Sequence, residues 1–500
     1  MRIYILPSLF AVRSSWVVPV KISRFFCYFR VKQNYLNGGS MAQLANAARD
    51  TWSSKWAFML AAAASAVGLG NLWRFPYLAA KYGGGMFLLT YLVLVFTFGL
   101  SLLLVEIALG RKTRQSTIGA FKMFGKKYAF IGILASLVPF IITPYYCVIG
   151  GWVAKYLGAY FFDAPTAIGD GGDYFSSFIT SNFESYIWLF IFMFIVFFVV
   201  SRGIKGGIEK ANLVMMPALI IMTIILVVYT LSQPGALDGA AYYLVPDFSA
   251  FSIELVVAAL GQMFFSLSIA MGIMVTYGSY MKQRDSLTSS AIRVAGFDIG
   301  VSFLAGLMIV PAAFVALGSP ESVTENSGPG LMFIVLPQMF ASFGDFAPII
   351  GVLFFLLVIF AALTSAISLT ETCVSIMHDG AKCSRKKATL LTFIIIGAAA
   401  ILVNLGYNGL SFIEPLGEGS SLLDFFDFVS NTIMMPIVAF LTCIFVGWCI
   451  KPKIIEDEIM ASSPFRWRAA WRIMIKYIAP ILIAIVFISF LAQFLGFMTI

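Results

Sequence analysis

Charged and metal-binding side chains are scarce in this chain of 500 residues. Asp, Glu, Lys and Arg together make up 11% of it, and histidine occurs once, at His378. The six cysteines are scattered and form no Cys-x-x-Cys pair, which argues against a disulfide framework and against a zinc site. The sequence has no phosphate-binding glycine loop and no nucleophile motif, so it does not indicate an enzyme.

Long apolar runs make up most of the chain instead. Hydrophobic residues account for 60% of it and the mean hydropathy is +0.93, values that are typical of a polytopic membrane protein. Because lipid cannot satisfy free backbone groups, we predict an all-α membrane protein. The apolar runs predict eleven spans, centred near residues 66, 97, 145, 193, 220, 266, 304, 360, 396, 437 and 485.

The connections between these spans alternate in charge. Lysine and arginine gather in residues 111–127, 202–210, 282–293, 382–387 and 451–476, and the connections between these are acidic. Since basic loops stay in the cytoplasm, we expect a multi-pass protein of the inner (cytoplasmic) membrane, with the amino terminus inside and the carboxyl terminus outside. The net charge of +9 then reflects topology, and no nucleic-acid partner is expected. The sequence does not indicate an oligomeric state.

The first forty residues differ from the rest, because they are basic and contain no Asp or Glu. One interpretation is a signal peptide or short anchor. We favour an extra amino-terminal segment, 1–40, upstream of a true start at Met41, because "MAQLANAARDTWSSK" is typical of a cytoplasmic lead-in. Residues 41–500 would then form the membrane domain.

The first span is interrupted where a helix is expected. "SAVGLGNLWRFP" places Gly68 and Gly70 beside Asn71, with Arg74 and a proline close behind. An interior glycine costs a helix about 1 kcal/mol, and unwound backbone is tolerated in a membrane only where it lines a cavity or binds something. Close helix packing through small residues would explain the glycines but neither Asn71 nor Arg74. We therefore predict a binding site here.

The sixth span carries a second interruption. In "GQMFFSLSIAMG", Ser266, Ser268 and Gly272 break an apolar run. The two broken spans are each the first of a group of five, a pattern typical of transporters built from inverted repeats with a binding site at the midplane. The repeats would cover about 50–232 and 254–450, followed by an eleventh helix at about 472–497.

Other polar side chains lie at membrane depth. They are Asp298, Thr364, Ser365 and Glu371, together with Asp424 and Asp427 at the outer end of the tenth span. An intramembrane charge costs at least about 2.5 kcal/mol, so each carboxylate is a functional candidate. A solvated helix start explains Asp424 and Asp427 equally well.

At these residues the sequence closely resembles the neurotransmitter:sodium symporter family, in particular its bacterial amino-acid transporters with eleven helices. The match runs from about Arg49 to the end of the chain, and its most specific elements are "GLGNLWRFP", "KYGGG", "VEIALGR", "GGWVAKY", "RGIKGGIEKANLVMMP" and "GQMFFSLSIAMG". The resemblance implies an inverted-repeat (5+5) fold of the LeuT type plus one additional helix. It also implies a sodium-coupled symporter that imports a neutral, hydrophobic or aromatic amino acid by alternating access.

The resemblance implies two sodium (Na+) sites built from oxygen donors, which suit a hard cation. The residues it assigns to the first site are Ala66, Asn71, Ser266 and Asp298, joined by the substrate carboxylate. The residues it assigns to the second site are Ala64, Val67, Ala361, Thr364 and Ser365.

By the same resemblance the amino acid lies between the two breaks. Backbone amides near Leu69 and Gly70 and the Tyr146 hydroxyl would hold its carboxylate. The residues assigned to the pocket are Ser65, Ala66, Gly68, Leu69, Gly70, Ile142, Tyr146, Phe265, Ser266, Ser268, Met271, Ala366 and Leu369. Gly68 stands where monoamine carriers of the family have an aspartate, so the substrate is expected to bring its own carboxylate.

The resemblance also assigns two gates. The outer gate pairs Arg74 with Asp427, and the inner gate pairs Arg49 with Asp379, supported by Tyr280. One position near the pocket departs from the family pattern, because Ala270 replaces a usual glycine. Its methyl group would either narrow the pocket or reduce the unwinding of the sixth helix.

Asp298 is the second departure. Chloride-dependent members of the family have an asparagine there and hold the anion among positions that are here Tyr91, Gln262, Ser266 and Ser302. A fixed carboxylate at this place supplies negative charge beside a sodium ion. We therefore expect transport without chloride.

Two other interpretations stay open. A proton-coupled amino-acid carrier of related fold would need a titratable group in place of the second sodium ion, and Thr364 and Ser365 argue against it. A channel or an amino-acid-binding sensor would bind amino acids without accumulating them, and the two gates disfavour an open pore.

Overall fold

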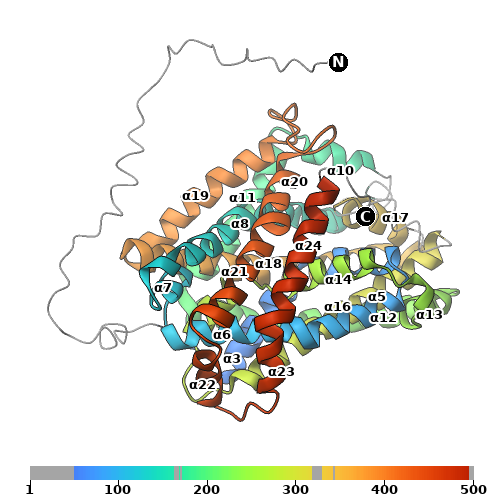
Figure 1. Ribbon diagram of the computed structural model, residues 1–500. Coiled ribbons are helices and arrows are strands. Elements are labelled where there is room, and N and C mark those ends of the chain that lie inside the picture. The colour runs from blue at the N-terminus through green and yellow to red at the C-terminus, as the bar shows by residue number, and fades with distance from the viewer. Residues whose placement is uncertain (1–49, 163–167, 169–171, 318–328, 342–343, 495–500) are drawn as a thin grey trace, which may run out of the picture. The chain divides into compact units, whose positions relative to one another are not determined.

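The computed structural model describes residues 50–162, 168, 172–317, 329–341 and 344–494, and most of these are helical (Figure 1). The predicted all-α fold class is therefore confirmed. The segment 1–40 and Arg49 of the predicted inner gate lie outside the described residues.

The helices run through the chain in the following order. They are α3 Lys55–Ala66, η1 Gly70–Arg74, α4 Phe75–Lys81, α5 Gly85–Leu94, η2 Val95–Gly99, α6 Leu100–Thr113, α7 Thr117–Lys122, η3 Lys126–Tyr128, α8 Ala129–Phe162, α10 Gly172–Ile179, α11 Glu184–Ser201, η4 Ile204–Ile208, α12 Glu209–Leu231, α13 Ala236–Leu244, η5 Phe248–Ala250, α14 Ile253–Ser266, α15 Ile273–Ser279, α16 Leu287–Leu317, η7 Leu331–Val335, α17 Leu336–Ala341, η8 Gly344–Phe346, α18 Ala347–Ala381, α19 Arg385–Leu405, α20 Leu422–Asp427, η9 Phe428–Met434, α21 Met435–Ile444, η10 Phe445–Cys449, α22 Lys453–Met460, α23 Arg468–Ile473, η11 Met474–Ile478 and α24 Ala479–Phe494.

Among the described residues, nine continuous helical segments are long and apolar enough to cross a membrane. A bent pair, Lys55–Ala66 and Gly70–Lys81, makes a tenth span if it is counted as one. The sixth of the eleven predicted spans does not qualify, because its unwinding leaves α14 and α15 as two short helices. The chain is thus a multi-pass protein, and the difference from the predicted number lies at the second break.

The first break is a short extended segment. Helix α3 ends at Ala66, and the backbone of the next residue, Val67, is extended with φ −81° and ψ 99°. The chain then enters the π-helical turn η1, and the pair is bent by 52°. The Asn71 side-chain oxygen accepts a hydrogen bond from the Gly68 N–H at 3.0 Å. Asn71 thereby satisfies a backbone donor that the unwinding removes from the helix.

The second break contains left-handed residues that are not glycine. Between α14 and α15, the φ angles of Ser268, Ala270 and Gly272 are +53°, +65° and +72°. The left-handed region costs a residue with a Cβ atom roughly 1–2 kcal/mol. The Ala270 N–H donates to Glu106 Oε1 at 2.7 Å, which holds this conformation. The methyl of Ala270 therefore does not restore the helix.

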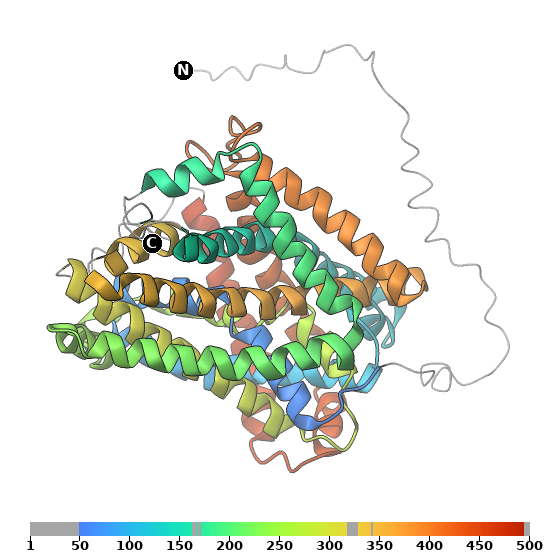
Figure 2. The same cartoon turned by 180° about the vertical axis from the view of Figure 1, so that it is seen from behind.

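Helix α15 lies very close to α6 because both carry glycine at the contact. A Cβ atom on Gly110 would lie 1.9 Å from the Val275 carbonyl oxygen. A Cβ atom on Gly278 would lie 2.4 Å from the Ile107 carbonyl oxygen. Small residues allow this approach of backbones in membrane helices. Elsewhere α12 lies alongside α18 (Figure 2).

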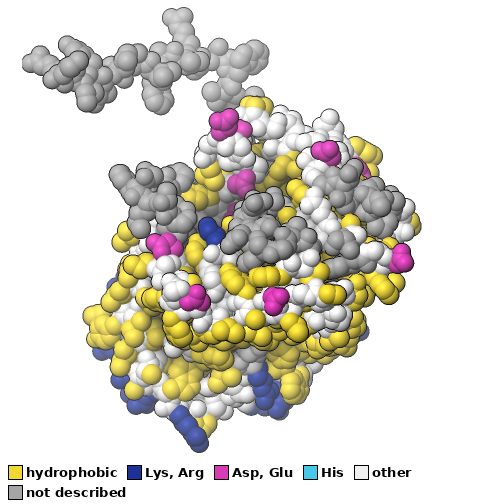
Figure 3. Space-filling view, turned by 90° about the vertical axis from the view of Figure 1, so that its right-hand side faces the viewer, with side chains coloured by type: hydrophobic (Ala, Val, Ile, Leu, Met, Phe, Trp, Pro, Cys, Tyr) yellow, Lys and Arg dark blue, Asp and Glu magenta, His cyan; other side chains and the backbone are white. Residues whose placement is uncertain are grey.

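The surface separates by charge. In Figure 3 lysine and arginine gather at one end of the face in view, acidic side chains lie toward the other end, and a hydrophobic band lies between them. We refer to these as the basic end and the acidic end. The arrangement matches the alternation of basic and acidic connections in the sequence, while the orientation in the membrane stays a prediction.

Gly110→Ala is expected to destabilise the protein, because its methyl group would overlap the Val275 carbonyl oxygen and overpacking costs about 1–3 kcal/mol or more. Gly296→Ala on α16 is the matched control, since its methyl would meet nothing within 4 Å. Thermal unfolding in detergent should give a lower midpoint for Gly110→Ala alone. Equal midpoints for the two variants would contradict the close contact of α6 with α15.

Candidate functional site

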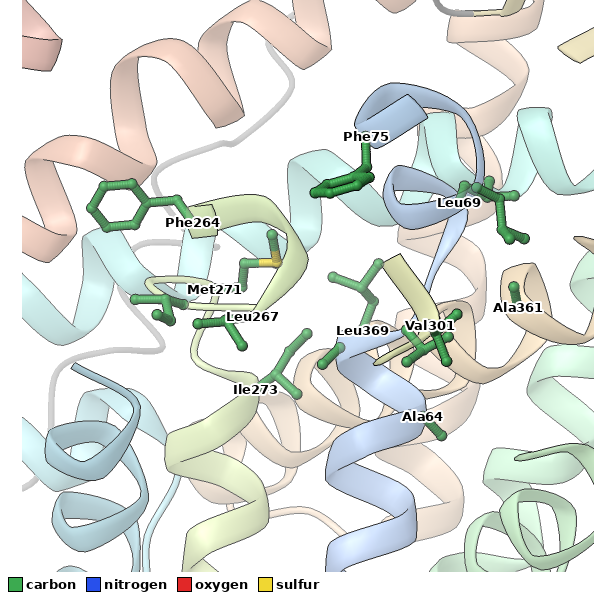
Figure 4. Packing of buried hydrophobic residues seen from close by; sticks show 14 of the residues in the cluster. Ala64, Leu69, Phe75, Phe264, Leu267, Met271, Ile273, Val301, Ala361 and Leu369 are labelled. Carbon is green, nitrogen blue, oxygen red and sulfur yellow. The ribbon is translucent and has the colours of Figure 1, made fainter. Parts of the chain in front are cut away.

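The two broken helices face each other and enclose a small cavity. Figure 4 shows both interruptions, with Leu69 on the first and Leu267 and Met271 on the second. The cavity measures about 20 Å³, which is room for about one water molecule. Its lining residues are Ser65, Ala66, Gly68, Gly70, Asn71, Ile142, Tyr146, Phe265, Ser266, Ser268, Met271, Ile273, Ser365 and Leu369.

Hydroxyl groups and an aromatic ring lie directly on the unwound backbone of the first break. The Leu69 N–H donates to the Tyr146 hydroxyl at 3.3 Å. A Cβ atom on Gly68 would lie 2.6 Å from Ser365 Oγ, and one on Gly70 would lie 2.6 Å from the Phe265 ring. A side chain at either position would therefore have to displace Ser365 or Phe265 from its place in this structure.

Asp298 is the centre of a buried polar cluster. Its Oδ1 accepts from Ser266 Oγ at 2.5 Å and from Asn71 Nδ2 at 2.8 Å, while its Oδ2 accepts from the Tyr91 hydroxyl at 2.9 Å. Asn71 Nδ2 also lies 2.7 Å from Ser302 Oγ. Asp298 is fully buried, and the partners that the structure gives its carboxylate are neutral donors. The structure thus brings together four of the five residues at the predicted anion-site positions.

Gln262, the fifth of these positions, bonds to the first break instead. Its Nε2 donates to the Gly70 carbonyl at 3.0 Å. Its Oε1 is buried and has no hydrogen-bond partner among the described residues. Gln262 therefore gives the Gly70 carbonyl, which already accepts the Phe75 N–H, a second donor, and keeps one acceptor of its own unused.

The predicted second sodium site lies where α18 meets the end of α3. Ser365 Oγ is 3.3 Å from the Ser65 carbonyl oxygen and 3.5 Å from that of Val67. Thr364 Oγ1 donates to the Ala361 carbonyl at 3.0 Å within its own helix. Ala64 is fully buried on α3. The predicted hydroxyls thus lie beside carbonyls of the first break and of α18.

The wall of the cavity differs from the predicted pocket at five positions. Leu69 and Ala366 were expected to line it and do not, whereas Asn71 and Ser365, which were predicted for the sodium sites, do line it. Ile273, the first residue of α15, lines the cavity and was not predicted. Ala270 does not line it, so its methyl group does not narrow the cavity.

The outer gate differs from the predicted ion pair. The structure gives Arg74 and Asp427, both described, no contact within ion-pair distance. Asp427 Oδ1 instead accepts from the Tyr145 hydroxyl at 3.0 Å and from Asn431. The positive charge of Arg74 still acts on the Asp427 carboxylate electrostatically. Tyr145 and Asn431 carried no local sequence signal for this role.

At the predicted inner gate, Asp379 and Tyr280 belong to different contacts. Asp379 Oδ2 accepts from the Ser116 N–H at 2.8 Å, whereas the Tyr280 hydroxyl donates to Glu371 Oε1 at 2.9 Å. Glu371 is fully buried and forms an ion pair with Arg385 at the start of α19. This pair explains why a carboxylate is tolerated at Glu371. The sequence offered Glu371 as a candidate but did not identify Arg385 as its partner.

Known proteins resemble this chain over most of its length. The model of the sodium:neurotransmitter symporter family matches residues 49–166 and 175–498. An uncharacterized sodium-dependent transporter of Methanocaldococcus jannaschii is 34% identical, over 88% of this chain and 90% of its own. A further one, YhdH of Bacillus subtilis, is 33% identical, over 88% of this chain and 97% of its own.

A solved structure resembles the fold as well. The crystal structure of MhsT in complex with L-phenylalanine matches with a TM-score of 0.79 at 35% identity, and the match covers 88% of this chain and 100% of that one. The family and these relatives are transporters and not enzymes, which agrees with the sequence prediction. Membership of this family, together with the likeness to an amino-acid complex, supports a sodium-coupled transporter of amino acids. The chain belongs to the sodium:neurotransmitter symporter family.

Proposed function

We propose that this protein imports a neutral hydrophobic or aromatic amino acid by symport with two sodium ions and without chloride. The observation that carries the proposal is the cavity between the two breaks. None of the described residues that line it is charged, and its walls combine Ile142, Met271 and Leu369 with the hydroxyl of Tyr146. The phenylalanine bound by MhsT supports the same class of substrate.

The substrate carboxylate would bind at the first break. The Leu69 N–H and the Tyr146 hydroxyl already lie 3.3 Å apart there, and both are donors that a carboxylate accepts. The amino group would meet the Ala66 carbonyl and the Ser266 region across the cavity. An amino acid would offer a carboxylate to the donors of the first break and an amino group to the carbonyls across the cavity. An amine alone would leave the donors of the first break without a substrate acceptor.

The cavity must expand to admit such a substrate. At about 20 Å³ it holds no amino-acid side chain, so Phe265, Met271 and Leu369 must move outward. Phe265 is the natural candidate for this movement, because its ring lies on Gly70 at the cavity wall. In alternating access the same movement would open the cavity to one side at a time.

The first sodium ion would bind among Asn71, Ser266 and Asp298. Asn71 now turns its Nδ2 toward Asp298 and its Oδ1 toward the Gly68 N–H. The second lone pair of Asn71 Oδ1 would coordinate a cation while the bond to the Gly68 N–H persists. The Asp298 charge would then be neutralised by sodium, so no chloride is needed beside it.

The second sodium ion would bind between α3 and α18. Ser365 already reaches the Val67 carbonyl, and Thr364 reaches that of Ala361. Oxygen ligands suit a hard cation. Because these oxygens come from two separate helices, the affinity of the cation would depend on the position of α3 relative to α18. A cation here would therefore couple sodium binding to the movement of α3 against α18.

Thr364→Val is expected to raise the sodium concentration for half-maximal amino-acid binding by at least about tenfold, because a cation site loses one oxygen. Thr372→Val is the matched control. Thr372 Oγ1 donates to the Ser368 carbonyl of the same helix at 2.9 Å, as Thr364 does to Ala361. The measurement is amino-acid binding by both variants as a function of sodium concentration. An equal shift of the half-maximal sodium concentration in the two variants would exclude a sodium site at Thr364.

Asp298→Asn is expected to make transport depend on chloride, because it removes the fixed negative charge and keeps the shape. Uptake into proteoliposomes should be unaffected by replacing chloride with gluconate in the wild type. In the variant, uptake should fall by at least about tenfold in gluconate and recover in part with chloride. Wild-type uptake that collapses in gluconate would reject the proposal.

The substrate class is tested by competition among the twenty amino acids for sodium-dependent binding. Phenylalanine, leucine and similar residues should compete best, and charged amino acids should not compete. Gly68→Ala should abolish binding of all of them, since its methyl would lie 2.6 Å from Ser365 Oγ. Gly296→Ala serves as the control for the substitution itself. Preferred binding of a charged amino acid would overturn the substrate assignment.

A further inference from the structure

Helix α22, which follows the tenth span, carries two buried carboxylates. Glu456 and Glu458 lie two residues apart, and their side chains are 1% and 8% exposed. Two residues along a helix turn the side chain by about 200°, so the two carboxylates point to opposite faces. Figure 1 places α22 next to α23 and at the same end of the molecule as α6. Each of the two carboxylates forms ion pairs with different basic side chains.

Glu458 pairs with Arg111, which lies in the last turn of α6 and is completely buried. Arg111 Nε lies 2.7 Å from Glu458 Oε1, and its Nη2 donates to the Glu458 carbonyl. Its Nη1 donates to the Asp285 carbonyl at 2.7 Å and to Ser462 Oγ at 3.0 Å. One guanidinium therefore joins α6, the segment around α22 and the connection that contains Asp285.

Asp285 lies six residues beyond the end of α15, the helix that begins at the second break. The first residue of α15, Ile273, lines the cavity. Just beyond the other end of α15, the Met281 carbonyl accepts a hydrogen bond at 3.3 Å from Arg114, the residue directly after α6. The two arginines thus hold the chain that leaves α15 from the side of α6. Movement of this end of α15 away from α22 requires the Arg111 contacts to break.

The opposite face of α22 makes weaker contacts. Glu456 bonds to Arg472 with both oxygens at 2.7 Å, and Arg468 lies 3.6 Å away. Both arginines belong to α23 and their side chains are about half exposed. Pairs with an exposed cation are screened by solvent and salt. Arg111 is fully buried in its pair with Glu458, although the partly exposed Lys112 also lies 3.8 Å from the other Glu458 oxygen.

We propose that Arg111 and Glu458 are positioning residues for transport: they form a clamp at the basic end that sets how often α15 opens the cavity there. The clamp rests on the proposed function, because it supposes that this end opens during alternating access. A buried ion pair is a costly way to hold two helices together if stability is its only role, since apolar side chains do so as well or better. Its directional contacts to the Asp285 carbonyl give it two discrete states, joined and released.

The test compares Glu458→Gln with Glu456→Gln in the full-length protein. Both changes remove one charge from the same helix, but only the first removes the carboxylate that pairs with the buried Arg111 and with Lys112, so the Arg111 guanidinium keeps only its contacts to the Asp285 and Glu458 carbonyls and to Ser462. Hydrogen–deuterium exchange of the amides in 273–286 should become at least about tenfold faster in Glu458→Gln and stay near wild type in Glu456→Gln. In proteoliposomes, Glu458→Gln should also increase the ratio of substrate efflux to sodium-driven accumulation.

The double variant Arg111→Met/Glu458→Leu separates positioning from stability. It replaces the pair by apolar side chains of similar size and is expected to keep the thermal midpoint of the wild type. The clamp predicts that exchange in 273–286 stays fast in this variant. Exchange that returns to the wild-type rate together with the midpoint would overturn the clamp, as would equal exchange in the two single variants.

These results do not depend on the identity of the substrate. If the wild type shows no sodium-dependent binding of any amino acid, the proposed function fails, while exchange in 273–286 still reports on the clamp. If binding is present and exchange does not respond to Glu458→Gln, only the clamp fails.

Discussion

Backbone groups freed inside a membrane protein are the constraint on which this structure depends. Unwinding at Val67–Gly70 removes helix hydrogen bonds where little water can replace them, and each unsatisfied group would cost several kcal/mol, on the order of a lost hydrogen bond in an apolar medium. Side chains meet this demand at the two freed amides, because Asn71 accepts from the Gly68 N–H and Tyr146 from the Leu69 N–H, and Gln262 adds a second donor to the Gly70 carbonyl, which already accepts the Phe75 N–H. Two of the three come from other elements, α8 and α14. The break therefore fixes how these helices surround the cavity, and it leaves the donors and acceptors that a substrate can take over.

The same constraint explains the two buried carboxylates near the second break. Glu106 holds the Ala270 N–H in its left-handed conformation, and its Oε2 has no hydrogen-bond partner among the described residues. Asp298 has three neutral donors and is completely buried. A carboxylate held in this way gains most from a cation, because neutral donors compensate its desolvation only in part. At the proposed first sodium site, Asp298 would therefore favour a cation, which would contact α16 as well as η1 and α14.

Much of this could be predicted from the sequence, because the signals were local. The apolar runs gave the helices, and the glycines beside Asn71 gave the first break at its observed place. The sequence could not predict contacts that depend on which helices meet. Arg385 lies in a basic loop like many others, and nothing in its neighbours indicates that it reaches the buried Glu371. Ile273 lines the cavity only because left-handed backbone at Ala270 and Gly272 turns α15, and propensity does not predict a left-handed alanine. The ion pair predicted between Arg74 and Asp427 is not formed between these two described residues here, and nothing local in the sequence indicates that Tyr145 and Asn431 donate to Asp427 instead.

The two ends of the molecule are closed by different kinds of contact. At the basic end, Glu371–Arg385 and Arg111–Glu458 are ion pairs in which at least one partner is fully buried. At the acidic end, the Asp427 carboxylate is held by the neutral donors Tyr145 and Asn431, and Arg74 acts on it only from a distance. Separating a buried pair leaves two charges to be solvated, whereas releasing a neutral donor from a carboxylate that water can reach leaves one group that water readily binds. Opening toward the basic end therefore has the higher intrinsic cost. In the proposed sodium-coupled import, opening at the basic end is therefore the step that the binding of sodium and substrate would have to drive.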